Sequence, residues 1–376
     1  MIAGGGIAAL EAALTLGELA GGAIATTLLT PRTTFTHRPL NVLEPFAGAG
    51  GRSYDLIAIA RAAGARVCHA ELERVDAERR LVHTTGGQAL PYDVLLIAYG
   101  AEVGPRFKHA RTIDDRYLGD RLHGLVRDVE DGYVRRVAFV TTGPPAWPLP
   151  LYELALMTSR AAYDMSAEMS VFIVTPERSP LEVFGDVASR TVASLLEHHG
   201  IELVTAPACD VPAPGRVTVG SGRAALRVQS VVAMPHLAPR RVAGVPVNVD
   251  GFIEVDANCR VGGLSDVYAA GDATAFAVKH GSIAALQADA AATEIARQAG
   301  ADVPPEPFHP VLHGMLLGAD RPLYLRARLS AGGRPLDSEA SDAPLWHPPG
   351  KIAARRLGPY LRHADQLTGS FSHAEL

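Results

Sequence analysis

The sequence predicts an α/β protein with two doubly wound parallel-sheet domains and a smaller C-terminal region, and three observations carry this prediction. A glycine-rich turn, Gly4-Gly5-Gly6, runs directly into an apolar pattern with helical spacing. The alternation of strands and helices restarts near Arg136, as in parallel sheets with crossover helices. Residues 266–274 then read as a buried strand that ends in a Gly-Asp turn and precedes a long helix over 282–299. The chain is therefore expected to return to its first domain after completing the second.

Length and composition fit this organisation. A chain of 376 residues is expected to form two or three domains, and 48% hydrophobic with 20% charged residues is typical of a globular protein. We expect the first domain to comprise residues 1–105 and 246–303, the second 106–245, and a C-terminal cap or interface region 304–376. The formal net charge of −5 provides no basic surface, so we expect no nucleic-acid partner.

The apolar periodicity places individual elements within these regions. In the first domain it predicts a strand over 23–30, a helix over 53–63, a β-meander over 66–88 and a buried strand over 94–98. In the second domain it predicts strands over 137–140, 170–174, 202–205, 216–219 and 230–234, and helices over 151–162 and 186–199. The C-terminal region reads as proline-rich loops with short β runs such as 322–329.

Cysteines and apolar segments bear on the compartment. Cys68, Cys209 and Cys259 are far apart and never form C-x-x-C, so neither a disulfide framework nor a zinc site is predicted. The apolar N-terminal segment lacks the basic start of a signal peptide and carries Glu11 and Glu18. The cysteine usage favours a reducing compartment, so we expect a cytoplasmic protein, with peripheral attachment to the inner face of the membrane as the alternative. The sequence holds no run of 18 uncharged apolar residues, so no transmembrane helix is predicted.

The opening turn fits a phosphate-binding fingerprint. In Gly4-x-Gly6-x-x-Ala9, Gly4 permits a tight turn, Gly6 lets the backbone approach a pyrophosphate, and the small Ala9 allows close helix–strand packing. The anion would lie at the helix N-terminus, where N–H groups and the helix dipole favour negative charge. An ordinary glycine turn is the alternative for this motif alone. Gly271-Asp272 supports the first interpretation, because Asp272 could accept a hydrogen bond from the ribityl chain of a flavin.

Three segments together resemble the two-dinucleotide-domain flavoproteins, which include sulfide:quinone oxidoreductases, type II NADH dehydrogenases, flavocytochrome c sulfide dehydrogenases and ferredoxin reductases. The segments are the opening fingerprint, the strand-plus-glycine run over 92–101, and the Ala-Ala-Gly-Asp segment within 268–274. Their order and wide spacing are specific, and the resemblance covers roughly residues 1–326. It implies two Rossmann-like dinucleotide-binding domains, each a three-layer arrangement, a small C-terminal cap, and FAD as the cofactor of the first domain.

The resemblance also implies which residues contact the cofactor. The helix after the Gly-Asp turn would offer N–H groups near the pyrimidine edge of the flavin and stabilise its anionic reduced form. The expected cofactor-binding residues are Gly4, Gly6, Ile7, Ala8, Ala9, Pro31, Arg32, Arg38, Pro39, Ala98, Tyr99, Gly100, Gly271, Asp272, Gly281, Ser282 and Ile283. Lys279 is expected beside the flavin as a catalytic residue, with a solvated loop as the alternative. Thr30-Pro31-Arg32 stands where the family has an acid for the adenosine ribose, so the backbone and Arg32 would hold that end.

The second domain departs further from the family pattern. The family places G-x-G-x-x-G for NAD(P)H at its first turn, but this chain has Gly143-Pro-Pro-Ala-Trp147-Pro-Leu-Pro, whose prolines lack the N–H donors that a phosphate needs. NAD(P)H is therefore expected only in a modified site. Glu177-Arg178 could contact a nucleotide ribose, although a polar turn is the favoured interpretation.

A proline-rich turn before Tyr152-Glu153 resembles the sulfide-oxidising branch of the family. None of the three cysteines fits a reactive pair beside a flavin, so each is expected to be structural. Glu153 is a candidate catalytic residue for proton transfer because burial would raise its pKa, and a solvated carboxylate in the first helical turn is the alternative. The histidines show no metal-ligand spacing, so we predict no metal.

The C-terminal segment 351–362 mixes basic and apolar residues and is interrupted by Gly358-Pro359. We expect it to pack over the flavin or against a partner subunit in a homodimer, and contact with a membrane surface is the alternative. Trp346 and Tyr360 are candidates for capping the flavin pocket, with simple packing as the alternative.

These features lead to an FAD-dependent oxidoreductase that passes two electrons from NAD(P)H or another small donor through the flavin to a quinone or protein acceptor. One alternative is a flavoprotein subunit or redox sensor without turnover, whose nicotinamide site is degenerate. Another is a flavin-free nucleotide-binding interaction protein. Reduction of the flavin by NAD(P)H separates the first two, and a colourless preparation favours the third.

Overall fold

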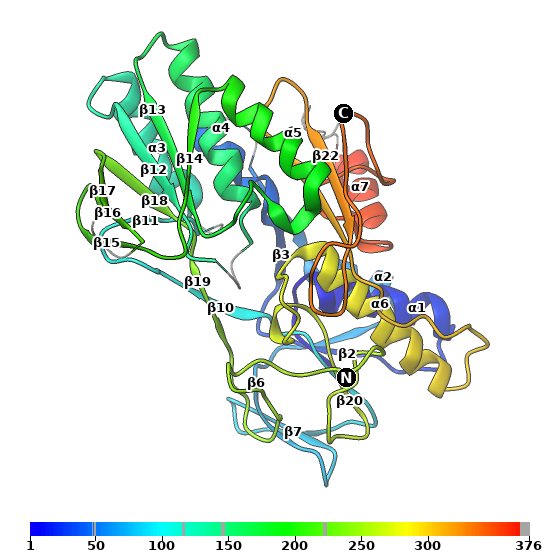
Figure 1. The fold of residues 1–376 in the computed structure, drawn as a ribbon. Coiled ribbons are helices and arrows are strands. Elements are labelled where there is room, and N and C mark those ends of the chain that lie inside the picture. The colour runs from blue at the N-terminus through cyan, green and yellow to red at the C-terminus, as the bar shows by residue number, and fades with distance from the viewer. Residues whose placement is uncertain (47, 49, 115–116, 144–146, 221–223, 369–376) are drawn as a thin grey trace.

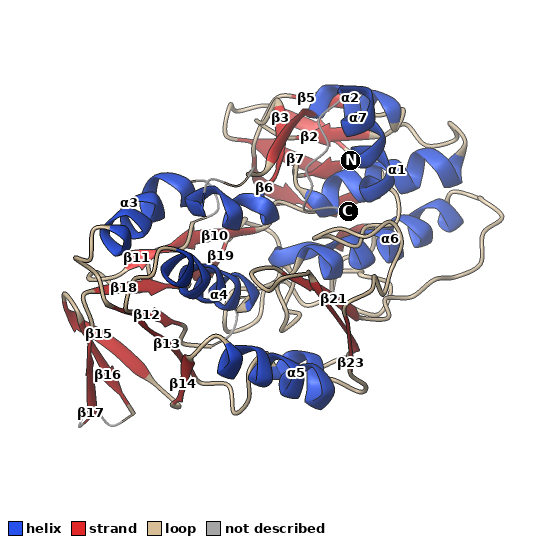
Figure 2. Ribbon diagram, turned by 90° about the horizontal axis from the view of Figure 1, so that it is seen from above, coloured by secondary structure: helices blue, strands red, loops and turns tan. Residues whose placement is uncertain are grey.

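The computed structural model describes residues 1–46, 48, 50–114, 117–143, 147–220 and 224–368 of the chain. Figure 1 shows two lobes, each with a parallel sheet, and a C-terminal region that lies against helices of both lobes. Figure 2, which views the molecule from above, shows the helices packed on the sheets. The predicted α/β class with two Rossmann-like sheets is confirmed.

The first sheet is parallel throughout and has the strand order β20-β9-β1-β2-β5. Its strands are β1 (Ile2–Ala3), β2 (Thr27–Leu29), β5 (Arg66–Cys68), β9 (Leu95–Ile97) and β20 (Val267–Ala269). Because β20 pairs with β9, the chain returns to the first sheet more than 150 residues after leaving it. The segment that carries Gly271 thus lies beside the segment that carries Ala98.

Two different layers cover the faces of the first sheet. On one face lie α1 (Ile7–Ala20), α2 (Leu56–Ala62) and α6 (Gly281–Gln298), and on the other a meander of β6 (Leu72–Asp76), β7 (Leu81–Thr84) and β8 (Ala89–Pro91). Alanines fill much of the contact between α1 and α6, including Ala8, Ala9, Ala284, Ala288 and Ala291. Such small side chains let the two helices pack closely (Figure 1), so that their N-terminal ends meet at the carboxyl edge of the sheet.

The second sheet repeats this arrangement. It is parallel with the order β11-β18-β12-β13-β14, from β11 (Arg111–Thr112), β12 (Arg136–Val140), β13 (Ser170–Thr175), β14 (Ile201–Thr205) and β18 (Ser230–Ala233). Helices α3 (Leu118–Glu130), α4 (Leu149–Asp164) and α5 (Gly185–His198) cover one face, with η2 (Glu182–Phe184) before α5. The antiparallel strands β15 (Cys209–Ala213), β16 (Arg216–Val219) and β17 (Ala224–Arg227) cover the other.

Two antiparallel strands connect the lobes. They are β10 (Ala101–Gly104), which leaves the first sheet, and β19 (His236–Pro239), which returns to it. The first lobe also contains a hairpin of β3 (Thr34–His37) and β4 (Arg52–Asp55), the 3-10 segment η1 (Arg38–Phe46) between them, and the short η3 (Gly271–Ala273). Strand β10 follows the carboxyl end of β9, and β19 follows the carboxyl end of β18. This antiparallel pair therefore joins the carboxyl edges of the two sheets.

The C-terminal region packs onto both lobes. Strands β21 (Val311–Leu316), β22 (Leu323–Arg328) and β23 (Glu339–Ser341) form an antiparallel sheet against α4, α5 and α6. Helix α7 (Leu357–Thr368) packs against α1 through Leu357 and Leu361. Over the described residues, no helix is long and apolar enough to cross a membrane.

Several sequence predictions need correction. The predicted meander begins too early, because β5 belongs to the parallel sheet and the meander spans 72–91. The predicted helix over 53–63 is shorter, since its first residues form β4. Gly358-Pro359 does not interrupt the C-terminal segment, because Pro359 lies in the first turn of α7, where its missing N–H costs no helical hydrogen bond.

Candidate functional site

The opening glycine turn lies against the end of β9. Gly4 has φ +149°, and a β-carbon added there would lie 2.2 Å from the Ala98 carbonyl oxygen, so only glycine fits. Gly6 is the N-cap of α1, and a β-carbon there would meet nothing within 4 Å. The first helical hydrogen bond runs from Leu10 N to the Gly6 carbonyl, so the N–H groups of Ile7, Ala8 and Ala9 precede it. With no acidic side chain in this first turn, the end of α1 is suited to bind an anion.

The second glycine turn meets the first at the same sheet edge. Gly271 has φ +79°, and its N–H donates to Oε1 of Gln287 at 2.8 Å. A β-carbon on Gly271 would lie 3.4 Å from those of both Ala8 and Ala284, so the starts of α1 and α6 flank this turn. Burial raises the pKa of the adjacent Asp272 carboxyl, and the Lys279 cation opposes that shift. The arrangement brings the Asp272 carboxyl, a hydrogen-bond acceptor, to the same sheet edge as the free N–H groups at the start of α1.

Lys279 is buried rather than solvated, so the solvated-loop alternative is wrong. Its residue is 6% exposed, and its Nζ donates to the Thr274 carbonyl and lies 4.0 Å from the centre of the Phe252 ring. Burial lowers the pKa of Lys279 to about 8, although Asp272 favours the charged form. An amine with this pKa can release or accept a proton near neutral pH.

The start of α6 is capped by its own N-cap residue. The Nδ1 atom of His280 accepts a hydrogen bond from Ser282 N at 3.2 Å, and Ser282 Oγ lies 2.7 Å from the same nitrogen. Burial lowers the pKa of His280 to about 3, which keeps the ring neutral. Trp147, two residues before α4, packs against this imidazole with ring centres 4.4 Å apart. Of the expected donors Gly281, Ser282 and Ile283, the Ser282 N–H is therefore engaged within the chain.

Glu153 is fully buried and bound to a lysine that the sequence analysis did not identify. Lys351 Nζ donates to Glu153 Oε1, and Leu317 N donates to the same oxygen at 2.8 Å. Both side chains of the pair are at most 3% exposed. The alternative of a solvated Glu153 carboxylate is therefore wrong. Nothing local in the sequence marks Lys351, because its partner is 198 residues away.

The remaining predicted residues lie just after β9, just after β2 and in η1. Ala98 and Gly100 follow β9, and Tyr99 between them donates its hydroxyl to the Arg240 carbonyl at 3.0 Å. Pro31 and Arg32 are exposed just after β2, while Arg38 and Pro39 begin η1. Thr30 Oγ1 would lie 2.6 Å from a β-carbon on Gly5, so this side chain fills the place beside the glycine turn.

A cavity of about 1080 Å³ opens at the carboxyl edge of the second sheet. Its lining includes Thr141 and Thr175 at strand ends, Trp147, Glu177, Lys279 and Arg334. Lys279 thus borders both this cavity and the Gly271-Asp272 turn. Its volume admits a small organic molecule or a nucleotide.

Glu177 is a half-buried carboxylate that lines this cavity. Its Oε2 accepts hydrogen bonds from the Tyr152 hydroxyl at 2.7 Å and from Thr175 Oγ1 at 3.0 Å. Burial raises the pKa of Glu177 to about 7, and the Tyr152 hydrogen bond opposes that rise. Glu177 and Arg178 both line the cavity, and the Arg178 side chain is 94% exposed.

The cysteines do not form a redox pair. Cys68 lies on β5, Cys209 begins β15, and Cys259 is fully buried. Burial raises the pKa of Cys209 to about 11 and raises that of Cys259 further, which keeps both as thiols. Within the described residues, no group of three or more His, Cys, Asp or Glu side chains could hold a metal ion.

Comparisons with known proteins agree with this geometry. Residues 1–294 match the family model described as pyridine nucleotide-disulphide oxidoreductase, and the chain belongs to this family. A search of curated protein sequences finds no match.

Solved structures show the same fold. The sulfide:quinone oxidoreductase from the hyperthermophilic bacterium Aquifex aeolicus is similar with TM-score 0.77 and 16% identity, over 91% of this chain and 86% of that one. A ferredoxin reductase from Rhodopseudomonas palustris follows with TM-score 0.65 and 18% identity, over 88% and 82% of the two chains. NDH2 from Plasmodium falciparum, solved in complex with NADH, has TM-score 0.57 and 17% identity, over 73% and 63%.

Proposed function

We propose that this protein is an FAD-dependent oxidoreductase that takes two electrons from a small donor and passes them to a quinone or a protein. The observation that carries this proposal is the convergence of the starts of α1 and α6 on two glycine turns at one sheet edge. This cradle suits a dinucleotide, because Gly6 leaves open space before the α1 N–H groups and Asp272 offers an acceptor for hydroxyl groups.

The bound flavin would supply a redox centre that exchanges two electrons. Around it, Gly4, Gly6 and the first N–H groups of α1 would hold the pyrophosphate, and Asp272 would hold the ribityl chain. Lys279 would hold or release a proton at Nζ, since its pKa is close to neutral. His280 would remain uncharged and keep the start of α6 in place. Backbone groups and Arg32 would contact the adenosine end.

The donor is proposed to bind in the cavity of the second lobe, because this cavity reaches Lys279. One similar structure is a sulfide:quinone oxidoreductase and another was solved in complex with NADH, so we propose sulfide and NADH as candidate donors here. NAD(P)H would have to bind without the usual phosphate turn, since Pro148 and Pro150 offer no N–H and Leu151 N is bonded to the Pro148 carbonyl. We propose that the site is modified rather than lost, because Glu177 lies where such folds read a ribose.

An anaerobic absorbance titration tests this proposal. The purified protein is mixed with NADH, then NADPH, then sulfide, while the visible bands of the oxidised flavin are followed. Bleaching by any of these donors on the timescale of mixing supports an oxidoreductase and names its donor. Flavin that is bleached by dithionite alone would overturn the proposed donor site.

A flavoprotein subunit or redox sensor without turnover is the second candidate. It is favoured by the Tyr152 and Thr175 hydrogen bonds that already occupy one oxygen of Glu177, together with the proline-rich turn. The same titration separates the two candidates, because a subunit of this kind would keep its flavin oxidised in the presence of all three donors.

A further inference from the structure

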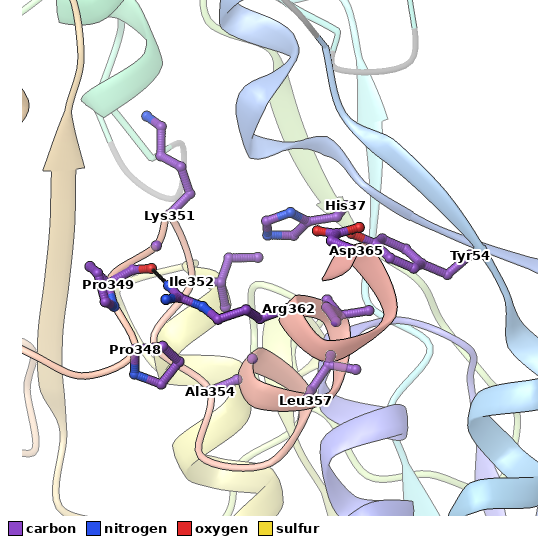
Figure 3. A pocket seen from close by; sticks show the side chains of 13 residues that line it. His37, Tyr54, Pro348, Pro349, Lys351, Ile352, Ala354, Leu357, Arg362 and Asp365 are labelled. Carbon is purple, nitrogen blue, oxygen red and sulfur yellow. Dashed lines mark hydrogen bonds between the residues drawn. The ribbon is translucent and has the colours of Figure 1, made fainter. Parts of the chain in front are cut away.

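The segment 348–357, here called the strap, connects the C-terminal sheet to α7 and crosses the starts of α1 and α6. Figure 3 shows it beside α7, with Lys351 pointing away from Tyr54 and Asp365. A β-carbon on Gly281 would lie 3.1 Å from Ile352 of the strap and 3.0 Å from Ile7, the first residue of α1, so both side chains pack at the start of α6. The cavity left between the strap, His37 and Tyr54 is only about 40 Å³.

Lys351 fastens one end of the strap to the second lobe. Its Nζ donates to Glu153 on α4 and, at 3.0 Å, to the Met315 carbonyl on β21. Lys351 is 4% exposed, so its charge is held away from water. Removing two charges from water costs much of what their attraction returns, and such a pair is weak support for stability. Its fixed partners instead specify where Lys351 and the adjacent Ile352 lie.

A second buried cluster fastens the other end of the strap to the first lobe. The Glu11 carboxylate on α1 accepts hydrogen bonds from Arg356 N at 2.8 Å and Leu357 N at 2.6 Å. The Arg356 guanidinium binds Asp289 on α6 and Glu18 on α1, each at 2.9 Å. The strap is therefore held between α4 on one side and the α1–α6 pair on the other.

We propose that Lys351 is a positioning residue that holds the strap over the starts of α1 and α6 and thereby encloses the FAD of the proposed function. The inference rests on that proposed function for its ligand. Glu153 holds the Lys351 ammonium group in place through their ion pair. Because Ile352 follows Lys351 directly, release of the lysine would free the apolar contact at Gly281 and admit water to this end of the site.

Three variants test this role. Lys351→Met removes the link but leaves the buried Glu153 charge without its cation, which can destabilise the fold. Glu153→Gln with Lys351→Met removes both charges, so the chain keeps its fold while the link is absent. Lys108→Met is the matched control, since Lys108 is exposed and outside the strap. The readouts are the dissociation constant of added FAD and the quenching of bound flavin fluorescence by iodide.

Loss of the link should weaken FAD binding about tenfold, equivalent to about 1.4 kcal/mol, and should increase iodide quenching. Both Lys351 variants should show these changes and Lys108→Met should show neither. Wild-type FAD affinity and quenching in the double variant would overturn the proposal, because that variant is folded and lacks the link.

A tryptophan measurement separates this inference from the proposed function. The chain has two tryptophans, and Trp346 lies just before the strap with its indole N–H on the Gly350 carbonyl at 3.2 Å. In a Trp147→Phe background, Lys351→Met should raise acrylamide quenching of Trp346 even without FAD. A wild-type chain that takes up no FAD overturns the proposed function. Unchanged Trp346 quenching overturns the positioning of the strap by Lys351.

Discussion

Substitution of the two fingerprint glycines by alanine should separate folding from cofactor binding. At Gly4, alanine would occupy φ +149° and place its β-carbon 2.2 Å from the Ala98 carbonyl oxygen. The backbone strain and the overlap together should lower the free energy of unfolding by about 2–6 kcal/mol. At Gly6 the backbone is extended, with φ −99°, and the β-carbon meets nothing, so Gly6→Ala should cost about 1 kcal/mol or less.

Gly6→Ala should leave stability nearly unchanged but should weaken the binding of FAD. Its β-carbon would project into the space from which a pyrophosphate approaches the α1 N–H groups, so FAD affinity should fall about tenfold or more. Urea unfolding followed by circular dichroism measures stability, and titration of FAD against the folded protein measures affinity. Equal destabilisation by both substitutions, or normal FAD affinity in Gly6→Ala, would refute this account of the turn.

Three further predictions concern other buried groups. Because the folded protein binds a proton at Glu177 up to pH about 7 and an unfolded chain only up to about 4.5, the free energy of unfolding should fall as pH rises through that window. Glu177→Gln should flatten this dependence in urea titrations, and an unchanged slope would contradict it. The variant Cys68→Ser with Cys209→Ser and Cys259→Ala should keep its flavin reduction rate within about twofold, since no thiolate acts; loss of reduction would show otherwise. Glu11→Ala removes the acceptor of the Arg356 and Leu357 N–H groups, so it should lower the free energy of unfolding by about 1–3 kcal/mol and speed tryptic cleavage at Arg355 or Arg356. An unaltered digestion rate would show that these hydrogen bonds do not hold this end of the strap.

The local parts of the fold could be predicted from the sequence. The glycine turn before α1, the helix after the Gly-Asp turn and the strands β12, β13, β14 and β18 of the second sheet depend on periodicity and turn residues within short windows. The sequence does not predict β11, because a strand of two residues shows no such pattern. The β10–β19 connection was not predicted, because its short strands pair over more than 130 residues and their pattern resembles a loop. Similarly, Val67 was assigned to the meander, since a three-residue strand such as β5 does not reveal its sheet.

The site divides in the same way. Gly4 and Gly271 could be proposed because their positive φ angles favour glycine. Gly6 and Asp272 could be proposed from the spacing of the fingerprint and from the Gly-Asp turn. Lys351 could not, because a lysine in a loop is normally solvated and only its distant partner Glu153 explains its burial. His280 lies two residues before the helix predicted over 282–299, and its role as the N-cap of α6 could not be predicted because caps are more often Ser, Thr, Asp or Asn.

The FAD content of the protein tests the central claim most directly. The protein is purified without added cofactor, a portion is then incubated with FAD and freed of excess, and the flavin released on denaturation is quantified for both. The account predicts FAD in an amount equimolar with the chain, in the isolated or the reconstituted protein. A folded chain that neither contains FAD nor takes it up would contradict it.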